Sequence, residues 1–354
     1  MGVPLNLPLN LDHKKVLIIR LSALGDVIRT IPSVMGLMKR FPNAQFHWLV
    51  ENSSGALVRE IPGLKPMEID RASLRSANPL KVGGTLLRTV RRIRAEAFDV
   101  SIDYHGVAKS GMFALFAGIP LRIGYERGGS KEGHRWLINH RYTMPDIAVS
   151  RYERNLAIAR FIDPAVDPAT PKFEPGPEQR AHIETVMAEQ PILLFPGTST
   201  HGRNKRWPAQ NWAWLFRNLS ARSPVRFVFG PADKEYRERL HHVLGESVPV
   251  LPPMSLLELC YALRRSRFLI SCDTGPMHLA SVMGVPLVAM LGPSDPVLNQ
   301  PLSGKCKVLL PEVPCAPCRN RSCTVLICQD ATTPKRVLEA ALTLLDELEP
   351  GRAF

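Results

Sequence analysis

The sequence predicts an α/β protein made of two doubly wound domains with parallel sheets. Short apolar runs, typical of buried parallel strands, alternate with segments of helical periodicity through the 354 residues. A proline-rich segment divides the chain near its middle, and polar turns that contain glycine follow strands in both halves. The expected strands are 16–20, 46–50, 99–103, 192–195, 225–229, 248–251, 268–272 and 286–291.

The first expected unit is a strand, a turn and a helix. Residues 15–20 (KVLIIR) form a compact β run, and the apolar residues from Val27 to Phe41 recur at helical spacing. Gly25 is the only glycine of the turn between them, so the three-glycine dinucleotide fingerprint is absent. Asp26 stands at the start of the helix, where a carboxylate suits either a helix N-cap or a general base pointing into a cleft.

The boundary between the two domains is predicted by composition. Residues 163–177 contain five prolines in fifteen residues, which is typical of a linker. We therefore expect an N-terminal domain over residues 1–172 and a C-terminal domain over 173–354, with the last helix either in the second domain or packed back on the first. Facing each other across a cleft, the two domains would bring Asp26 and the turn at Asp273 together.

A polar loop follows the first strand of the second domain. Residues 195–208 (FPGTSTHGRNKRWP) combine hydroxyls, flexible glycines and adjacent cations at the sheet edge where α/β proteins bind ligands. Hydroxyls and backbone N–H groups bind phosphate oxygens, and Lys205 can act as a point charge on a diphosphate. A plain surface loop is the alternative. After the next strand, Glu235 offers an acceptor for ribose hydroxyls. The candidate phosphate-binding residues of the loop are Thr198, Ser199, Thr200 and Lys205.

The segment from Asp273 to Pro296 is the most informative of the chain. The apolar run 269–272 is followed by Asp273, Thr274 and Gly275, which would lie at the carboxyl end of a parallel strand. Gly275 permits close approach of a ligand, and the helix after it would point free N–H groups at an anion. This pattern indicates capture of a phosphorylated small molecule, although Asp273 and Thr274 are also ordinary helix caps and His278 an ordinary structural residue.

Four of the seven cysteines lie close together near the C-terminus. They occupy fourteen residues of a loop before the final helix, and such clustering is typical of a structural zinc or another thiophilic metal; four free thiols or disulfides are the alternative. The other three cysteines are scattered, as reduced thiols are. The clustered residues are Cys315, Cys318, Cys323 and Cys328.

The charge of the chain indicates an anionic partner. Its net charge is +13 at pH 7, and arginines cluster in the first half, for example from Arg88 to Arg94. Few aromatic residues accompany these charges and no nucleic-acid module is recognisable, so we expect no nucleic acid. A phosphorylated lipid or an anionic membrane surface would also account for the positive charge. The absence of a long apolar run and of a signal peptide predicts a cytoplasmic protein.

Five stretches, in this order, resemble the lipopolysaccharide heptosyltransferase family, which is glycosyltransferase family 9. The resemblance covers about residues 14–345, and the co-occurrence of the stretches is far more specific than any one of them. They are RLSALGDVIRTIP, DVSIDYHGVAKSG with RIGYER, FPGTSTHGRNKRWP, LPPMSLLEL and DTGPMHLASVMGVPLVAMLGPSDP.

The resemblance implies a GT-B fold, with an acceptor-binding first domain and a donor-binding second domain. It implies an inverting, metal-independent transfer of heptose from ADP-heptose to the anionic inner core, Kdo-lipid A or heptosyl-Kdo-lipid A. The enzyme would be peripheral at the cytoplasmic face of the inner membrane. No cofactor would be required for catalysis.

The resemblance also implies roles for individual residues. Asp26 would deprotonate the acceptor hydroxyl, Lys205 and a hydroxyl among Thr198, Ser199 and Thr200 would bind the donor diphosphate, and Glu235 would bind the ribose. Met254 would lie beside the nucleobase. The residues around the sugar and phosphates would be Asp273, Thr274, Gly275 and His278.

Two other functions are compatible with the sequence. A nucleotide-sugar epimerase of similar architecture would turn over the donor alone. A non-catalytic polyanion-binding protein would bind with steep salt dependence and without preference for a nucleotide.

Overall fold

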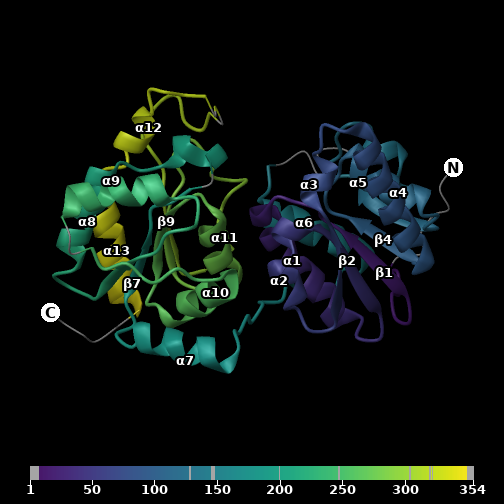
Figure 1. Cartoon of the computed structure of the whole chain (residues 1–354), viewed down its shortest axis with the longest axis horizontal. Coiled ribbons are helices and arrows are strands. Elements are labelled where there is room, and N and C mark those ends of the chain that lie inside the picture. The colour runs from purple at the N-terminus through teal and green to yellow at the C-terminus, as the bar shows by residue number, and fades with distance from the viewer. Residues whose placement is uncertain are drawn as a thin grey trace. The chain divides into compact units, whose positions relative to one another are not determined.

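The computed structural model describes residues 8–348 except 127–128, 145–147, 199, 246–247, 303, 319 and 321, and of Thr200 and His201 only the backbone (Figure 1). The chain divides into two compact units, Met1–Pro171 and Lys172–Phe354, one residue before the boundary expected from the prolines. The described part contains no helix that is both long and apolar enough to cross a membrane.

The first unit has a sheet of six parallel strands in the order β3-β2-β1-β4-β5-β6. This is the doubly wound order in which the chain reverses direction between β1 and β4. The strands β3, β5 and β6 were not expected, because they are short and interrupted by polar residues or proline. The strands are β1 (Lys15–Ile19), β2 (Gln45–Glu51), β3 (Leu64–Ile69), β4 (Val100–Asp103), β5 (Leu121–Tyr125) and β6 (His140–Tyr142).

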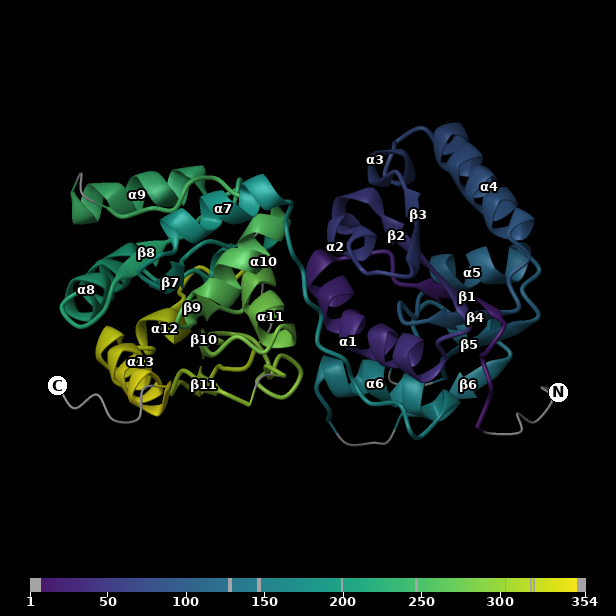
Figure 2. The same ribbon diagram turned by 90° about the horizontal axis from the view of Figure 1, so that it is seen from below.

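Helices cover both faces of this sheet. On one face α1 (Leu24–Arg40) packs against α6 (Arg151–Ile162), and on the other α4 (Pro79–Ala95) packs against α5 (Ala108–Phe116) (Figure 2). The helix α4 begins where the Asn78 side chain accepts hydrogen bonds from two backbone N–H groups, and α6 begins with a capping box of Ser150 and Glu153. Shorter helical turns are η1 (Asn52–Ser54), α2 (Ala56–Arg59), α3 (Arg71–Leu74) and η2 (His134–Trp136).

The second unit has a parallel sheet in the order β11-β10-β9-β7-β8. The expected strand at 248–251 is wrong: Val250 forms only an isolated bridge to Phe227, since Pro249 and Pro252 lack the N–H groups that a ladder needs. That bridge still extends the order beyond β8, so both units share one topology. The strands are β7 (Ile192–Phe195), β8 (Val225–Phe227), β9 (Leu269–Cys272), β10 (Leu287–Met290) and β11 (Cys306–Leu309).

In the described part of the second unit, helical segments cover the sheet. The last helix, for which packing on the first domain was also considered, packs within the second unit against α8, β10 and β11. Its Val337, Ala341, Leu344 and Leu345 are buried there. The segments are α7 (Pro177–Val186), η3 (Thr200–Lys205), α8 (Ala209–Leu219), α9 (Lys234–Leu244), α10 (Leu256–Arg265), α11 (Gly275–Val282), α12 (Ile327–Asp330) and α13 (Pro334–Leu348).

The topology selects one edge of each sheet for ligands. In doubly wound sheets the crevice lies beyond the carboxyl ends of the strands where the strand order reverses. In the first unit these are the loops after β1 and β4, and in the second unit the loops after β7 and β9. The candidate residues Asp26, Lys205 and Asp273 stand in these loops or directly after them.

Candidate functional site

Three arginine side chains surround Asp26 in the first unit. Its carboxylate lies 2.7 Å from Arg20, 3.0 Å from Arg29 and 3.9 Å from Arg151. Arg20 follows β1, Arg29 lies one turn further along α1, and Arg151 begins α6, which packs on α1. The Asp26 side chain retains 29% exposure, so a substrate hydroxyl can reach it.

The arginines keep Asp26 ionised. Burial alone would raise the pKa of Asp26, but the charges of Arg20, Arg29 and Arg151 outweigh burial and hold that pKa far below the usual range of a carboxyl. Asp26 also lies in the first turn of α1, where the helix dipole favours a negative charge. The structure therefore shows more than the expected cap: no side-chain cap bond is formed at this helix start, and Asp26 is the centre of an ion-pair cluster.

The end of β4 holds Arg20 in position and contributes His105. Arg20 Nη1 donates to the Tyr104 carbonyl at 2.5 Å, and the Leu21 N–H donates to His105 Nδ1 at 3.1 Å. Burial and the nearby Arg20 charge lower the pKa of His105 to about 4, so this imidazole is neutral at pH 7. Because Nδ1 accepts, the neutral ring carries its proton on Nε2.

A buried pair, Asp103 and His134, fixes the loop after β4. Asp103 Oδ1 accepts the N–H groups of His105 and Gly106 at 2.8 and 3.0 Å, and Asp103 Oδ2 lies 2.8 Å from His134 Nε2. Sequence reasoning missed Asp103, His105 and His134, although DVSIDYHG was among the family-like stretches. The signal was an acidic residue at the last position of a strand.

In the second unit, Lys205 and Asp273 meet across the reversal point of the sheet. Lys205 Nζ lies 2.6 Å from Asp273 Oδ2, so the loop after β7 contacts the loop after β9. Asp273 also lies 3.0 Å from His278 Nε2 and accepts the Ser294 hydroxyl at 2.5 Å. Burial alone would raise the pKa of Asp273, but His278 and Lys205 outweigh it and hold that pKa far below the usual range.

Lys205 and Asp273 differ in their exposure to solvent. The side chain of Lys205 is 31% exposed, whereas that of Asp273 is 3% exposed. Lys205 has three N–H donors, so it can bind an anion while it keeps its bond to Asp273. Asp273 and His278, expected around the sugar and phosphates, are both buried; Asp273 contacts Lys205, and His278 contacts Asp273.

A second buried carboxylate organises the start of the same loop. Asp233 Oδ1 accepts the Thr198 N–H at 3.1 Å, and Arg206 Nη2 lies 3.3 Å from the same oxygen. Arg206 Nε also donates to the Thr198 hydroxyl at 3.0 Å. Sequence reasoning chose Glu235 and missed Asp233 and Arg206, because nothing local distinguishes the two acids of the segment.

We expect Gly197→Ala to disrupt this arrangement. A Cβ at this position would lie 1.9 Å from Asp233 Oδ2, so the carboxylate would have to leave the N–H groups of Thr198 and Gly230. Losing buried hydrogen bonds of this kind costs about 1–3 kcal/mol each, which predicts a lower unfolding midpoint in calorimetry. Gly84→Ala is the control, since no atom lies within 4 Å of its Cβ position. Equal midpoints for the two variants would contradict the Asp233 assignment.

The other expected donor residues are placed as follows. Gly275 begins α11, and the Thr274 hydroxyl lies 3.1 Å from that of Ser271. Met254 is half-buried in the segment before α10. Glu235 is exposed on α9, 2.5 Å from Arg239 and 3.9 Å from Arg203. Ser199 and the side chain of Thr200 lie outside the described residues.

The expected metal site at the cysteines is not supported. No three His, Cys, Asp or Glu side chains in the described part of the chain converge as metal ligands would. Cys328 is buried and Cys323 half-buried, while Cys315 and Cys318 are exposed, and all four are free thiols. Burial and the charges of Cys315, Cys318 and Cys323 raise the pKa of Cys328, so the four thiols lie near one another, but the described side chains do not converge on one centre as zinc ligands would.

The loop that carries these cysteines has a structural contact with the site. The Gln329 side chain donates to the Asn204 carbonyl at 2.9 Å, and the Asn204 side chain donates to the Asn320 carbonyl at 2.8 Å. Asn204 directly precedes Lys205. The cysteine-bearing loop therefore holds the backbone next to Lys205 through Asn204.

Comparisons with known proteins identify the family. The model of the family described as Glycosyltransferase family 9 (heptosyltransferase) matches residues 86–328. Lipopolysaccharide heptosyltransferase 1 of Pseudomonas aeruginosa is 28% identical over 319 residues, which are 88% of this chain and 87% of that protein.

Solved structures show the same fold. The glycosyl transferase family 9 structure from Veillonella parvula DSM 2008 has a TM-score of 0.79 at 21% identity, covering 96% of this chain and 99% of that chain. An E. coli heptosyltransferase with ADP-2-deoxy-2-fluoro heptose has a TM-score of 0.70 at 20% identity, covering 94% and 99%. The expected GT-B class of α/β fold is thereby confirmed.

Proposed function

Because this chain belongs to glycosyltransferase family 9, the heptosyltransferases, we propose that it transfers heptose from ADP-heptose to the inner core of lipopolysaccharide. The observation that supports this most directly is the Lys205–Asp273 ion pair at the reversal point of the second sheet. It presents an oriented, partly exposed cation beside the N-terminus of α11, which is a site for a diphosphate. The relative named lipopolysaccharide heptosyltransferase 1 and the structure with an ADP-heptose analogue give the substrate class.

The second unit binds the donor in this proposal. Lys205 and the first N–H groups of α11 stabilise the negative charge that develops on the departing diphosphate. These groups take the place of a divalent ion, so catalysis requires none. Thr198 and the neighbouring hydroxyls contact phosphate oxygens, Glu235 contacts the ribose, and Met254 lies beside the nucleobase.

The first unit binds the acceptor and supplies the base. The acceptor oxygen forms a bond to the anomeric carbon from the face opposite ADP, the bond from that carbon to the diphosphate breaks, and the proton passes to the Asp26 carboxylate. The anomeric configuration is inverted as a result. A carboxylate as acidic as Asp26 takes the proton late, once bonding to carbon has made the hydroxyl acidic. Arg151, with its side chain 35% exposed, is available to an anionic group of the acceptor.

The acceptor is a lipid, which places the reaction at a membrane. We propose that the enzyme works as a peripheral protein at the cytoplasmic face of the inner membrane. Its net charge of +13 favours this, because that surface is anionic.

Donor choice and transfer can be tested together. We expect ADP-heptose to raise the unfolding midpoint more than UDP-, GDP- or CMP-sugars do, since a ligand at 100 times its Kd stabilises by about 2.7 kcal/mol. Heptose should pass to Kdo-lipid A or heptosyl-Kdo-lipid A, with or without EDTA. Turnover of ADP-heptose without acceptor would instead indicate an epimerase. Binding of polyanions without preference for a nucleotide would indicate a non-catalytic protein.

A further inference from the structure

Four large apolar side chains are exposed in the described part of the first unit, and all four lie on one face. Leu80 is 84% exposed, Leu87 49%, Phe116 55% and Trp136 67%. They belong to α4, α5 and η2. Figures 1 and 2 show α4 and α5 on the face of the sheet opposite α1 and α6, and η2 packs against α5. Large apolar side chains exposed on neighbouring elements of one face indicate an interaction surface.

The outer side of α4 combines apolar and basic residues. Thr85, Thr89 and Ile93 are buried at intervals of four residues and define the inner side. Leu80 and Leu87, seven residues apart, share the opposite side with Arg91 and Arg94. Gly83 and Gly84 lie between the two leucines with no atom within 4 Å of their Cβ positions, so nothing in the described chain covers this side.

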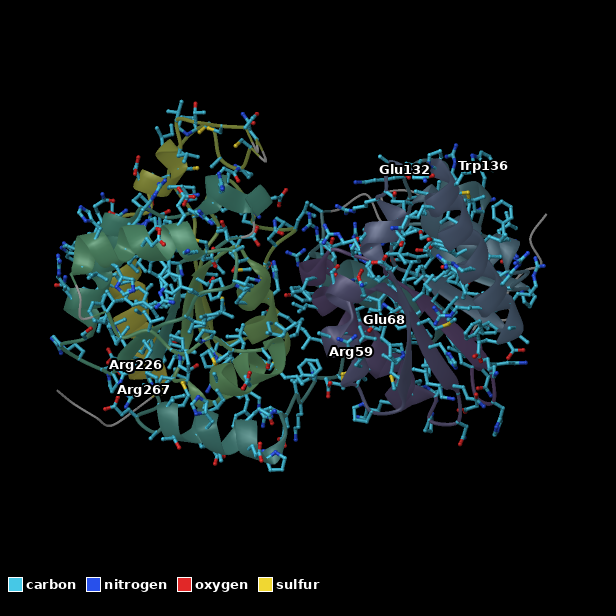
Figure 3. The ribbon with its side chains drawn as sticks, in the orientation of Figure 1. Arg59, Glu68, Glu132, Trp136, Arg226 and Arg267 are labelled. Carbon is cyan, nitrogen blue, oxygen red and sulfur yellow. The ribbon has the colours of Figure 1, made fainter. Side chains whose placement is uncertain are left out.

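The surface continues over α5 and η2. Arg94 Nη2 donates to the Phe116 carbonyl at 2.5 Å, which joins the end of α4 to the end of α5. Trp136 lies at the outer surface of the unit (Figure 3), with the guanidinium groups of Arg135 and Arg141 4.8 and 5.5 Å from its ring. Tryptophan flanked by arginines is typical of the interface between a bilayer and water.

Positive charge dominates this face. The helix α4 contains Lys81 and four arginines and no acidic residue. None of these arginines, Arg88, Arg91, Arg92 and Arg94, forms an ion pair within the described residues. Glu132 is four residues before Trp136, but Lys131, Arg135 and Arg141 outnumber it.

We propose that this surface, made of the outer side of α4 with Phe116 and Trp136, docks on an anionic lipid bilayer. The proposal rests on the proposed function and names the part of the chain that reaches the membrane. Arginines bind lipid phosphates while Leu80, Leu87, Phe116 and Trp136 enter the interfacial layer. A second copy of the chain fits less well, because it would bring the same positive charges together. Nucleic acid would need stacking aromatics where α4 exposes leucines.

The position of the surface suits an enzyme that acts on a lipid. Leu80 is at the start of α4, which follows the carboxyl end of β3 through α3, and Trp136 belongs to η2, which His134 ties to Asp103 at the carboxyl end of β4. Leu80 therefore lies toward the sheet edge that carries Asp26, and the surface extends from there toward the opposite edge, where α5 ends at Phe116 before β5. A lipid-anchored acceptor would enter the Asp26 edge from the docked membrane.

Sedimentation with vesicles tests the proposal. The full chain should bind vesicles of phosphatidylcholine with phosphatidylglycerol, release them at high salt, and ignore phosphatidylcholine alone. Changing Leu87→Ser together with Trp136→Ser should weaken binding by about tenfold or more. The matched control is Val325→Ser, an equally exposed apolar residue of the second unit (71% exposed), which should bind as the wild type does.

Two further measurements separate this proposal from the enzymatic one. The double variant should keep transfer to a water-soluble, deacylated acceptor, which shows that its fold and its site are intact. Binding of the double variant equal to that of the wild type, or equal binding of neutral vesicles, would overturn the docking surface. Absence of transfer by a wild-type chain that binds vesicles would overturn only the proposed function. Sedimentation of the chain as a dimer that the double variant abolishes, without vesicle binding, would assign the face to a second copy.

Discussion

Asp26→Asn should lower the rate of heptose transfer by about 100-fold or more, while ADP-heptose still binds. The amide keeps the size of the side chain but cannot accept the acceptor proton, and general base catalysis of this kind contributes about 10²–10⁴-fold. The donor groups belong to the second unit, so donor affinity measured by calorimetry should not change. The unfolding midpoint should fall, because Arg20, Arg29 and Arg151 would face one another without their shared anion.

The control for Asp26 is Asp70→Asn. Asp70 caps α3 in the same unit, where its loss affects only the helix start. If Asp26→Asn transferred heptose at the normal rate and only its unfolding midpoint fell, Asp26 would have a structural role and not a catalytic one.

The pH dependence gives a second test of Asp26. Its pKa in the folded protein lies far below the unfolded value of about 3.9, so it stays ionised across the working range. Its stabilising contribution is complete above about pH 4 and is lost as the pH falls toward the folded pKa. Accordingly, kcat/KM should show no loss attributable to this base between pH 5 and 8. A titration near pH 6 in the wild type that disappears in Asp26→Asn would contradict the arginine cluster.

Lys205→Ala should weaken ADP binding and slow transfer by about 100-fold. The ammonium acts on the diphosphate in the bound donor and more strongly on the leaving group, where removal of one electrostatic donor costs about 10²–10³-fold. Arg203→Ala is the matched control, since Arg203 lies in the same loop but is 67% exposed and bonds weakly to Glu235 at 3.9 Å. Unchanged ADP affinity by calorimetry would remove Lys205 from the site.

A double-mutant cycle tests whether Asp273 works through Lys205. Asp273 contacts the lysine at 2.6 Å and is itself buried, so Asp273→Asn should reduce donor affinity mainly by releasing the ammonium. The losses of donor-binding free energy in Lys205→Ala and in Asp273→Asn should then not add in the double variant. Full additivity would show that Asp273 acts on the donor independently.

The sequence predicts individual site residues but not the contacts among them. Asp26, Lys205 and Asp273 are predicted because each belongs to a polar segment that follows a strand, and such segments can be recognised locally. Arg151 was missed as a partner of Asp26, since 125 residues separate them and nothing in the segment around Arg151 refers to Asp26. Asp233 was passed over for Glu235, because burial distinguishes them and burial depends on Gly197 and Arg206.

Local pattern determined the two α/β domains, their boundary near the proline-rich segment, most of the strands and the turns that hold the site. Those features depend on the periodicity of apolar residues and on the backbone preferences of glycine and proline, which neighbours in sequence decide. Only the tertiary structure decided that Asp26 is bound by three arginines, that Asp273 is buried in contact with Lys205, and that two of the four clustered cysteines are exposed. Charge pairing and burial depend on which strand ends lie side by side in the sheet. The neighbours β1 and β4, and likewise β7 and β9, are adjacent in space but not in sequence.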